Sequence, residues 1–112
     1  MLKLKGLNNY NISEITALES RFGAENSADN VKSHKAVDLF LKGIAIIPIY
    51  GSIKKYAEEK VRLNKLGLAH NDEFDLLIGV TAIENKLTLV TENVKDFKRL
   101  EGLKIENWIV RK

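Results

Sequence analysis

The stretch NDEFDLLIGVTAIENKLTLVTENVKDF, residues 71–97, decides the fold of this chain. Its apolar run from Leu76 to Ile83 has the length of a buried helix, and the run from Leu87 to Thr91 has the length of a strand. Asp75 falls in the first turn of the expected helix. Because ligands of α/β sheets bind beyond the carboxyl ends of the strands, the stretch predicts a site around Asp75 at that edge.

Outward from this stretch, short apolar segments alternate with amphipathic ones. We expect strands at 10–12, 44–49, 87–91 and 103–109, and helices at 14–24, 28–42, between Ser52 and Gly67, at the Leu76 run and, briefly, after Asp96. Residues 1–9 fit either a short strand or a helical turn. The alternation predicts a single α/β domain over residues 1–112 with a mostly parallel sheet.

Burial expectations follow from the same patterns. The segment 44–49 is apolar on both faces, as strands of a parallel sheet are. The helix at 28–42 is expected to bury Val37, Phe40 and Leu41, and the next helix Ile53, Tyr56, Ala57 and Val61, with Glu59 and Arg62 on its solvated face. His70 is expected to have no metal-binding or catalytic role. Trp108 is expected to pack in the hydrophobic core.

Composition sets limits on function. The chain has 112 residues, 18 of them basic and 15 acidic, and no cysteine. Disulfides and thiolate metal sites are therefore excluded. No apolar run approaches the roughly 20 residues of a membrane span, and the start lacks a secretory signal, so a cytoplasmic protein without membrane contact is expected. The net charge of +3 permits contact with RNA without requiring it.

A set of acids from distant segments points to a metal site. Glu19 lies within the apolar stripe of the helix at 14–24, where it is either bound to a partner or reaches water from the edge of the stripe. Asp75, Asn93 and Asp96 are the other candidates. Carboxylates without histidine or cysteine suit Mg²⁺ or Mn²⁺, which can activate a water and neutralise a scissile phosphate. Helix-start chemistry or salt bridges are the alternative.

Several motifs resemble one family. The runs Asp75–Ala82 and Leu87–Phe97 closely resemble the C-terminal half of PIN-domain proteins, and of the VapC toxins in particular. The segment Ile12–Gly23 is similar to that family's T-x-x-E segment, and Gly102–Trp108 also fits. The resemblance implies a PIN-like (Rossmann-like, three-layer) fold and a metal-dependent RNA endonuclease, in many relatives acting on tRNA. It also implies a homodimer silenced by a small VapB-like antitoxin.

The resemblance also implies roles for individual residues. Glu19 and Asp75 match acids that bind Mg²⁺ or Mn²⁺ directly. Thr91 and Asn93 match the T-x-N/D site after the core strand, where many relatives carry an acid in place of the amide. Asp96 either compensates for that amide or caps the following turn.

The front of the chain departs from the family pattern. PIN domains begin with a central strand that ends in an aspartate, as in L-L-D-T-N, and no aspartate precedes Asp29 here. The chain is therefore interpreted as an N-terminally truncated PIN-like domain: a fragment, a misassigned start or a degenerate relative. The alternative function is a catalytically impaired module that binds an antitoxin or dimerises.

Overall fold

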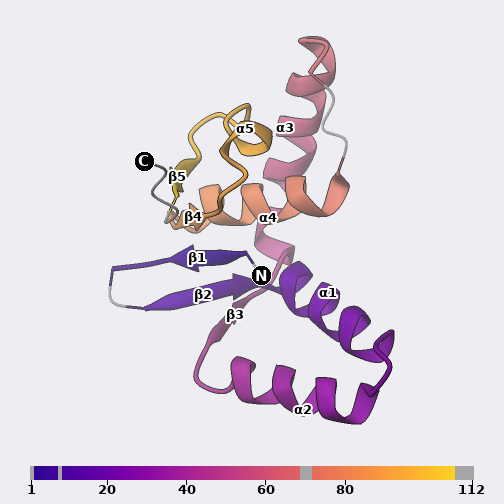
Figure 1. The fold of residues 1–112 in the computed structure, drawn as a ribbon. Coiled ribbons are helices and arrows are strands. Elements are labelled where there is room, and N and C mark those ends of the chain that lie inside the picture. The colour runs from indigo at the N-terminus through magenta and orange to yellow at the C-terminus, as the bar shows by residue number, and fades with distance from the viewer. Residues whose placement is uncertain (1, 8, 69–71, 108–112) are drawn as a thin grey trace, which may run out of the picture.

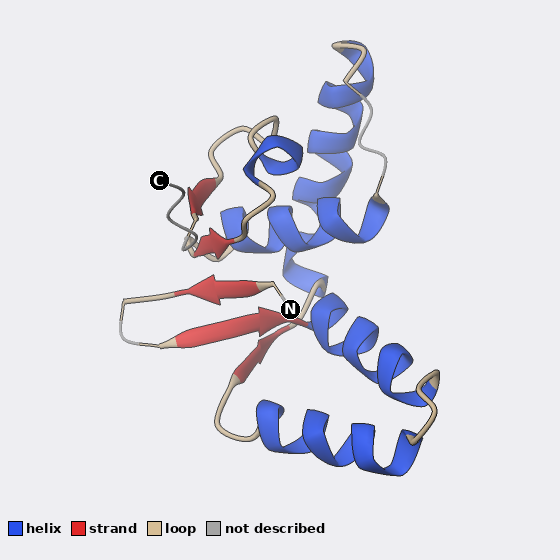
Figure 2. Cartoon of the chain, in the orientation of Figure 1, coloured by secondary structure: helices blue, strands red, loops and turns tan. Residues whose placement is uncertain are grey.

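The computed structural model describes residues 2–7, 9–68 and 72–107, which form one five-stranded sheet and the helices around it (Figures 1 and 2). His70 and Trp108 lie outside these residues. None of the helices in the described ranges is both long and apolar enough to cross a membrane.

The strands are β1 (Lys3–Lys5), β2 (Tyr10–Ser13), β3 (Ala45–Ile47), β4 (Thr88–Val90) and β5 (Lys104–Glu106). The helices are α1 (Glu14–Glu25), α2 (Asn30–Leu41), the 3₁₀ turn η1 (Tyr50–Ser52), α3 (Ile53–Lys65), α4 (Glu73–Glu84) and α5 (Val94–Phe97).

The strand order is β3-β2-β1-β4-β5. β2 pairs with β3 and β4 pairs with β5 in parallel, whereas β1 is antiparallel to both of its neighbours. Four strands therefore run in one direction, which confirms the mostly parallel sheet. The ambiguous N-terminal segment is a strand, and it takes the middle position of the sheet in the opposite direction to the other four.

Helix α4 is the centre of the core. Its side chains are apolar on nearly every face, and six of its residues are buried: Leu76, Ile78, Gly79, Val80, Thr81 and Ala82. They pack with Leu4 and Leu89 of the sheet and with Phe97 and Leu100 of the segment after β4. The buried helix and buried strand predicted from residues 71–97 are confirmed.

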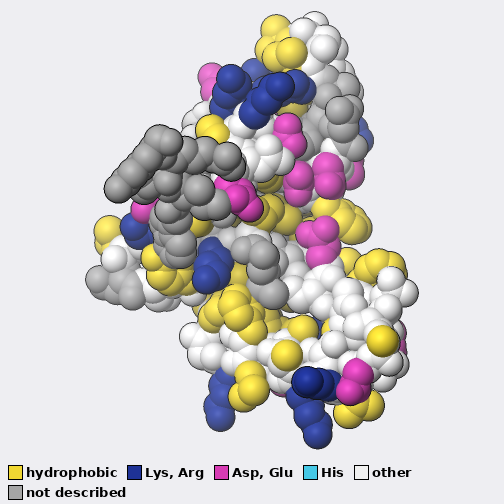
Figure 3. Space-filling view, viewed as in Figure 1, with side chains coloured by type: hydrophobic (Ala, Val, Ile, Leu, Met, Phe, Trp, Pro, Cys, Tyr) yellow, Lys and Arg dark blue, Asp and Glu magenta, His cyan; other side chains and the backbone are white. Residues whose placement is uncertain are grey.

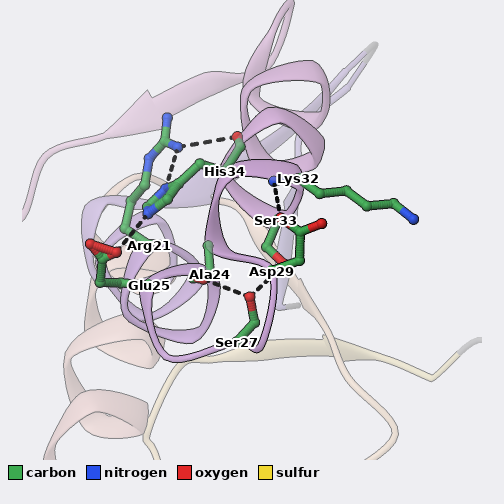
Figure 4. A network of polar contacts seen from close by, with 8 residues as sticks. All are labelled: Arg21, Ala24, Glu25, Ser27, Asp29, Lys32, Ser33 and His34. Carbon is green, nitrogen blue, oxygen red and sulfur yellow. Dashed lines mark hydrogen bonds and ion pairs between the residues drawn. The ribbon is translucent and has the colours of Figure 1, made fainter.

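Helices α1 and α2 form a pair that projects from the rest of the molecule (Figure 1). Ser13 caps α1 as predicted, because its Oγ accepts from the amide of Ile15 at 3.1 Å. Polar contacts join the two helices (Figure 4): Arg21 Nη1 lies 3.1 Å from Nδ1 of His34, and His34 Nε2 lies 3.5 Å from Oε2 of Glu25. The pairing of α1 with α2 is thus partly polar.

The burial predicted for the α2–β3 segment is wrong. α2 has no buried residue, and Val37, Phe40 and Leu41 are only half-buried. β3 is an edge strand with Ile46 43% exposed, although its sequence is apolar on both faces. Within the described residues this edge pairs only with β2, so an apolar pattern that suits an interior strand lies at the rim of the sheet.

The buried face predicted for α3 is also wrong. Ile53 and Val61 are about half exposed, while Glu59 and Leu63 are buried. Glu59 accepts two hydrogen bonds from Arg62 at 2.8 Å, and its Oε2 accepts from the amide of Glu101 at 3.2 Å. A buried carboxylate is tolerated when it is paired in this way, so a residue assigned to the solvated face lies inside.

The close packing of α4 on Leu100 predicts that Gly79→Ala destabilises the fold. An added Cβ would lie 2.3 Å from Cδ1 of Leu100, a side chain that is itself buried. We expect a loss of about 1–3 kcal/mol in unfolding free energy, as for other overpacked cores. Gly23→Ala in α1 is the matched control, because no atom lies within 4 Å of its added Cβ. It should be neutral or stabilising by up to about 1 kcal/mol in urea unfolding. Equal effects of the two variants would contradict this packing.

The Glu59–Arg62 pair predicts a second effect on stability. Hydrogen bonds from Arg62 hold the pKa of Glu59 below its ordinary value of 4.5. A carboxylate with a lowered pKa stabilises the fold at neutral pH, and this contribution disappears as the pH falls through the folded-state pKa. Glu59→Gln should therefore lower the free energy of unfolding by about 1–3 kcal/mol at pH 7. The exposed neighbour provides the control: Glu58→Gln should change it by less than about 0.5 kcal/mol. A loss that persists undiminished at pH 3 would argue against the ion pair as its cause.

Candidate active site

A cleft of about 690 Å³ lies beyond the end of β4, where the predicted site was expected. It is formed by the residue before β1, the first two turns of α1, the start of α4, the end of β4 with the segment after it, and the residue after β5. Its lining residues are Leu2, Thr16, Glu19, Ser20, Asp75, Val90, Thr91, Glu92, Asn93 and Asn107. Four of the five residues singled out in the sequence therefore share one cleft: Glu19, Asp75, Thr91 and Asn93.

The two carboxylates are brought together by helix packing. Asp75 lies in the first turn of α4, after the N-cap Asp72, whose Oδ1 accepts from the amides of Phe74 at 3.0 Å and Asp75 at 3.2 Å. Glu19 lies on α1, which packs against α4. Partial burial raises the pKa of Glu19, and the charges of Asp72 and Asp75 raise it further. A concentration of negative charge of this kind is what a cation would neutralise.

The segment after β4 is ordered by side-chain hydrogen bonds. Thr91 is 7% exposed, and its Oγ1 accepts from the amide of Asn93 at 3.0 Å. The Nδ2 of Asn93 donates to Oδ2 of Asp96 at 2.6 Å. This bond uses the nitrogen of the Asn93 side-chain amide, and an amide oxygen is the atom of that group that can bind a cation. Asp96 does not line the cleft and instead contacts Asn93.

Thr16 is a cleft residue that was not singled out in the sequence. It is 3% exposed, and its Oγ1 has no hydrogen-bond partner. Ser20 uses its own hydroxyl within the helix, donating to the carbonyl oxygen of Thr16 at 2.8 Å. The spacing T-x-x-E places Thr16 and Glu19 one helical turn apart on the same face, and that spacing is the signal by which Thr16 could have been found.

The donor set fits a hard divalent cation. Two carboxylates, a hydroxyl and an amide oxygen are the ligands that Mg²⁺ and Mn²⁺ take, and the described residues that line the cleft include neither histidine nor cysteine. Among the described residues no group of three or more aspartate, glutamate, histidine or cysteine side chains is placed to hold a metal ion. A cation here would therefore rest on two carboxylates, Glu19 and Asp75, and on neutral oxygens or water.

Comparison with known proteins gives one consistent answer. Residues 3–103 match the family described as PIN domain. The chain is 35% identical over 102 residues to "Ribonuclease VapC2" of Rickettsia felis, covering 90% of this chain and 75% of that protein. It is 26% identical over 98 residues to the "tRNA(fMet)-specific endonuclease VapC" of Salmonella typhimurium, covering 87% of this chain and 74% of that one. The crystal structure of VapBC2 from Rickettsia felis, bound to a promoter DNA fragment, superposes with a TM-score of 0.81 at 35% identity, over 88% of this chain and 74% of that one.

The charge crowding in the cleft predicts that Glu19→Gln stabilises the protein in metal-free buffer at pH 7. An acid with a raised pKa destabilises the fold when it is ionised, so the penalty develops as the pH rises past the unfolded-state value and is absent in acid. We expect a rise in melting temperature of at most about 3 °C, because Glu19 is largely exposed. The difference from wild type should vanish below pH 4.5, the ordinary value for glutamate. A fall in melting temperature at pH 7 in chelator would contradict this assignment.

Proposed function

This chain belongs to the PIN-domain family, and from that membership we propose that it is a VapC-type RNA endonuclease dependent on Mg²⁺ or Mn²⁺. The observation that carries the proposal is the meeting of Glu19 and Asp75 in one cleft with Thr91 and Asn93. These residues come from α1, α4 and the segment after β4, which lie far apart in the sequence.

Each residue has a definite role in the proposed reaction. Glu19 and Asp75 would hold the cation through carboxylate oxygens. Thr91 accepts from the backbone amide of Asn93 and Asp96 accepts from its side-chain amide, so the Asn93 side-chain oxygen would be available to the cation or its water. When bound, the divalent cation would activate water for attack and neutralise charge on the scissile phosphate. Because water is the nucleophile, no covalent link between the protein and the RNA is expected.

The raised pKa of Glu19 bears on the same proposal. In the absence of a cation, burial and the charges of Asp72 and Asp75 disfavour its ionised form. A bound cation would reverse that balance, so binding should release protons near the pH where Glu19 titrates. Cation affinity should therefore fall as the solution is acidified.

The test of the proposal is cleavage of a tRNA pool with Mn²⁺, with a chelator as the control. Asp75→Asn should reduce the cleavage rate at least about 100-fold, because it removes one of two carboxylate ligands. Asp29→Asn is a matched control: Asp29 caps α2 outside the cleft, and asparagine caps a helix equally well. Its rate should equal that of wild type. The proposal fails if Asp75→Asn cuts as fast as Asp29→Asn, or if cutting persists in chelator.

A second candidate function is binding of a partner without catalysis. Exposed apolar side chains lie on the α1–α2 pair, including Leu18, Phe22, Val31 and Leu39, and yellow side chains mark this half of the surface in Figure 3. The related Rickettsia felis and Salmonella typhimurium structures are VapBC complexes, so a VapB-like antitoxin is the partner proposed for this face. Retained antitoxin binding without Mn²⁺ binding or RNA cleavage would select this function over the first.

Three further expectations from the sequence stay predictions. They are the homodimer, the cytoplasmic location and the assignment of residues 1–112 to one domain. tRNA is the RNA class proposed for the first cleavage test because one of the relatives, from Salmonella typhimurium, carries a tRNA specificity in its name.

A further inference from the structure

One buried hydroxyl of the cleft has no partner among the described residues. Thr16 lines the cleft with only 3% of its surface exposed, and its Oγ1 makes no hydrogen bond to any of them. A hydroxyl that gives up its hydrogen bonds to water and gains none in the protein is costly. Most buried polar groups are satisfied, so an exception calls for a bound group or a functional reason. Thr16 is therefore a candidate contact for a ligand of the cleft.

The position of Thr16 in α1 explains why its hydroxyl has no partner. Inside a helix, a threonine hydroxyl can donate to the carbonyl oxygen four residues earlier. Thr81 of α4 does so, because its Oγ1 donates to the carbonyl oxygen of Leu77 at 2.7 Å. Thr16 lies in the first turn of α1, and the residue four positions earlier is Ile12 of β2. The usual helical acceptor is therefore missing at Thr16.

Two other polar side chains of the cleft already use their donor atoms within the protein. Ser20, one turn further along α1, donates its hydroxyl to the carbonyl oxygen of Thr16 at 2.8 Å. Asn93 donates its side-chain amide to Asp96 at 2.6 Å. Both residues line the cleft beside Thr16. The hydroxyl of Thr16, in contrast, keeps its proton for a bound group.

The surroundings of Thr16 favour an anionic acceptor once a cation is present. The first turn of a helix lies at the positive end of its dipole. Thr16 is one helical turn before Glu19, which with Asp75 would hold the cation. The charges of these two carboxylates would repel a free anion, whereas a bound divalent cation attracts one. A hydroxyl next to the cation can then donate to an anionic oxygen, and hydrogen bonds of that kind are strong.

We propose that Thr16 is a substrate-binding residue whose hydroxyl donates a hydrogen bond to a non-bridging oxygen of the RNA phosphate in the cleft. The inference rests on the proposed function, because it takes the cleft to hold a divalent cation and an RNA phosphate. It deepens that function by assigning the phosphate contact to a neutral residue that does not bind the cation. Threonine in a helix populates two χ1 rotamers, so ligand binding can turn the hydroxyl toward the phosphate.

The first experiment is thermal unfolding of the full chain in chelator. Thr16→Val replaces the unpaired hydroxyl with a methyl group of similar size, so the melting temperature should rise by at least about 3 °C. Thr81→Val is the matched control: its hydroxyl has a partner, so the same replacement should lower the melting temperature or leave it unchanged. A melting temperature of Thr16→Val that does not exceed that of wild type would overturn the inference, because the hydroxyl would then have no cost in the empty cleft.

The second experiment is calorimetric titration of inorganic phosphate, as the probe, into the Mg²⁺-loaded chain. Thr16→Ser keeps the hydroxyl and should bind phosphate as tightly as wild type. Thr16→Val should bind it at least about fivefold more weakly, because one hydrogen bond to a charged oxygen is lost. The affinity for Mg²⁺ alone should be the same in all three proteins.

Four outcomes of this titration would contradict the inference. They are no phosphate binding by wild type, equal phosphate affinity in wild type and Thr16→Val, equally weak binding by Thr16→Ser and Thr16→Val, and weaker Mg²⁺ binding by Thr16→Val. The third would assign the effect to the methyl group, and the fourth would make the hydroxyl a ligand of the cation.

The cleavage assay with the tRNA pool separates this inference from the proposed function. Phosphate binding that depends on the Thr16 hydroxyl, without RNA cleavage by wild type, would refute the nuclease and leave the contact between Thr16 and phosphate intact. RNA cleavage by wild type with unchanged phosphate affinity in Thr16→Val would do the reverse. If both hold, Thr16→Val should lower kcat/KM for the tRNA pool at least about fivefold, and Thr16→Ser should not.

Discussion

The burial of α4 against the sheet is the constraint on which the other features of this structure depend. A helix that is apolar on nearly every face has a low free energy only when it is covered on all sides. The sheet covers one side through Leu4 and Leu89, and the segment after β4 covers another through Phe97 and Leu100. Because the helix is rigid, fixing its core residues also fixes its first turn. Asp75 is therefore held at the edge of the sheet by packing that begins one residue after it.

The direction of β1 has a simple cause. Only a short turn separates β1 from β2, closed by the hydrogen bond from the amide of Gly6 to the carbonyl oxygen of Asn9 at 2.9 Å. A connection of this length joins antiparallel neighbours, whereas parallel neighbours need a crossover of a dozen or more residues. The centre of the sheet is consequently filled by a strand whose beginning, and not its end, reaches the cleft. This reversal brings the apolar Leu2 to the lining of the cleft.

The errors in the predicted burial have a common origin. An amphipathic pattern predicts that charged residues are exposed. That prediction is wrong when a charged residue is buried with a hydrogen-bonding partner that is distant in the sequence. Glu59 meets the amide of Glu101, and Arg62 donates to the carbonyl oxygen of Arg99 at 2.7 Å. These contacts hold α3 against residues 99–101, and Leu100 of that segment packs on α4. The strand order places β3 at an edge of the sheet, where its apolar sequence is not matched by burial.

The sequence by itself determined the elements that depend on local pattern. It predicted the buried helix with Asp75 in its first turn, a strand at residues 87–91, the cap at Ser13 and the mostly parallel α/β sheet, because periodicity and capping act over a few residues. It also singled out Glu19 as a carboxylate in an apolar stripe. Only the tertiary structure decided which of these residues meet. The packing of α1 on α4 brought Glu19 and Asp75 to one cleft, and Asp96 contacts Asn93 without lining that cleft. Such contacts depend on strand order and register, which are set by the packing of the whole chain.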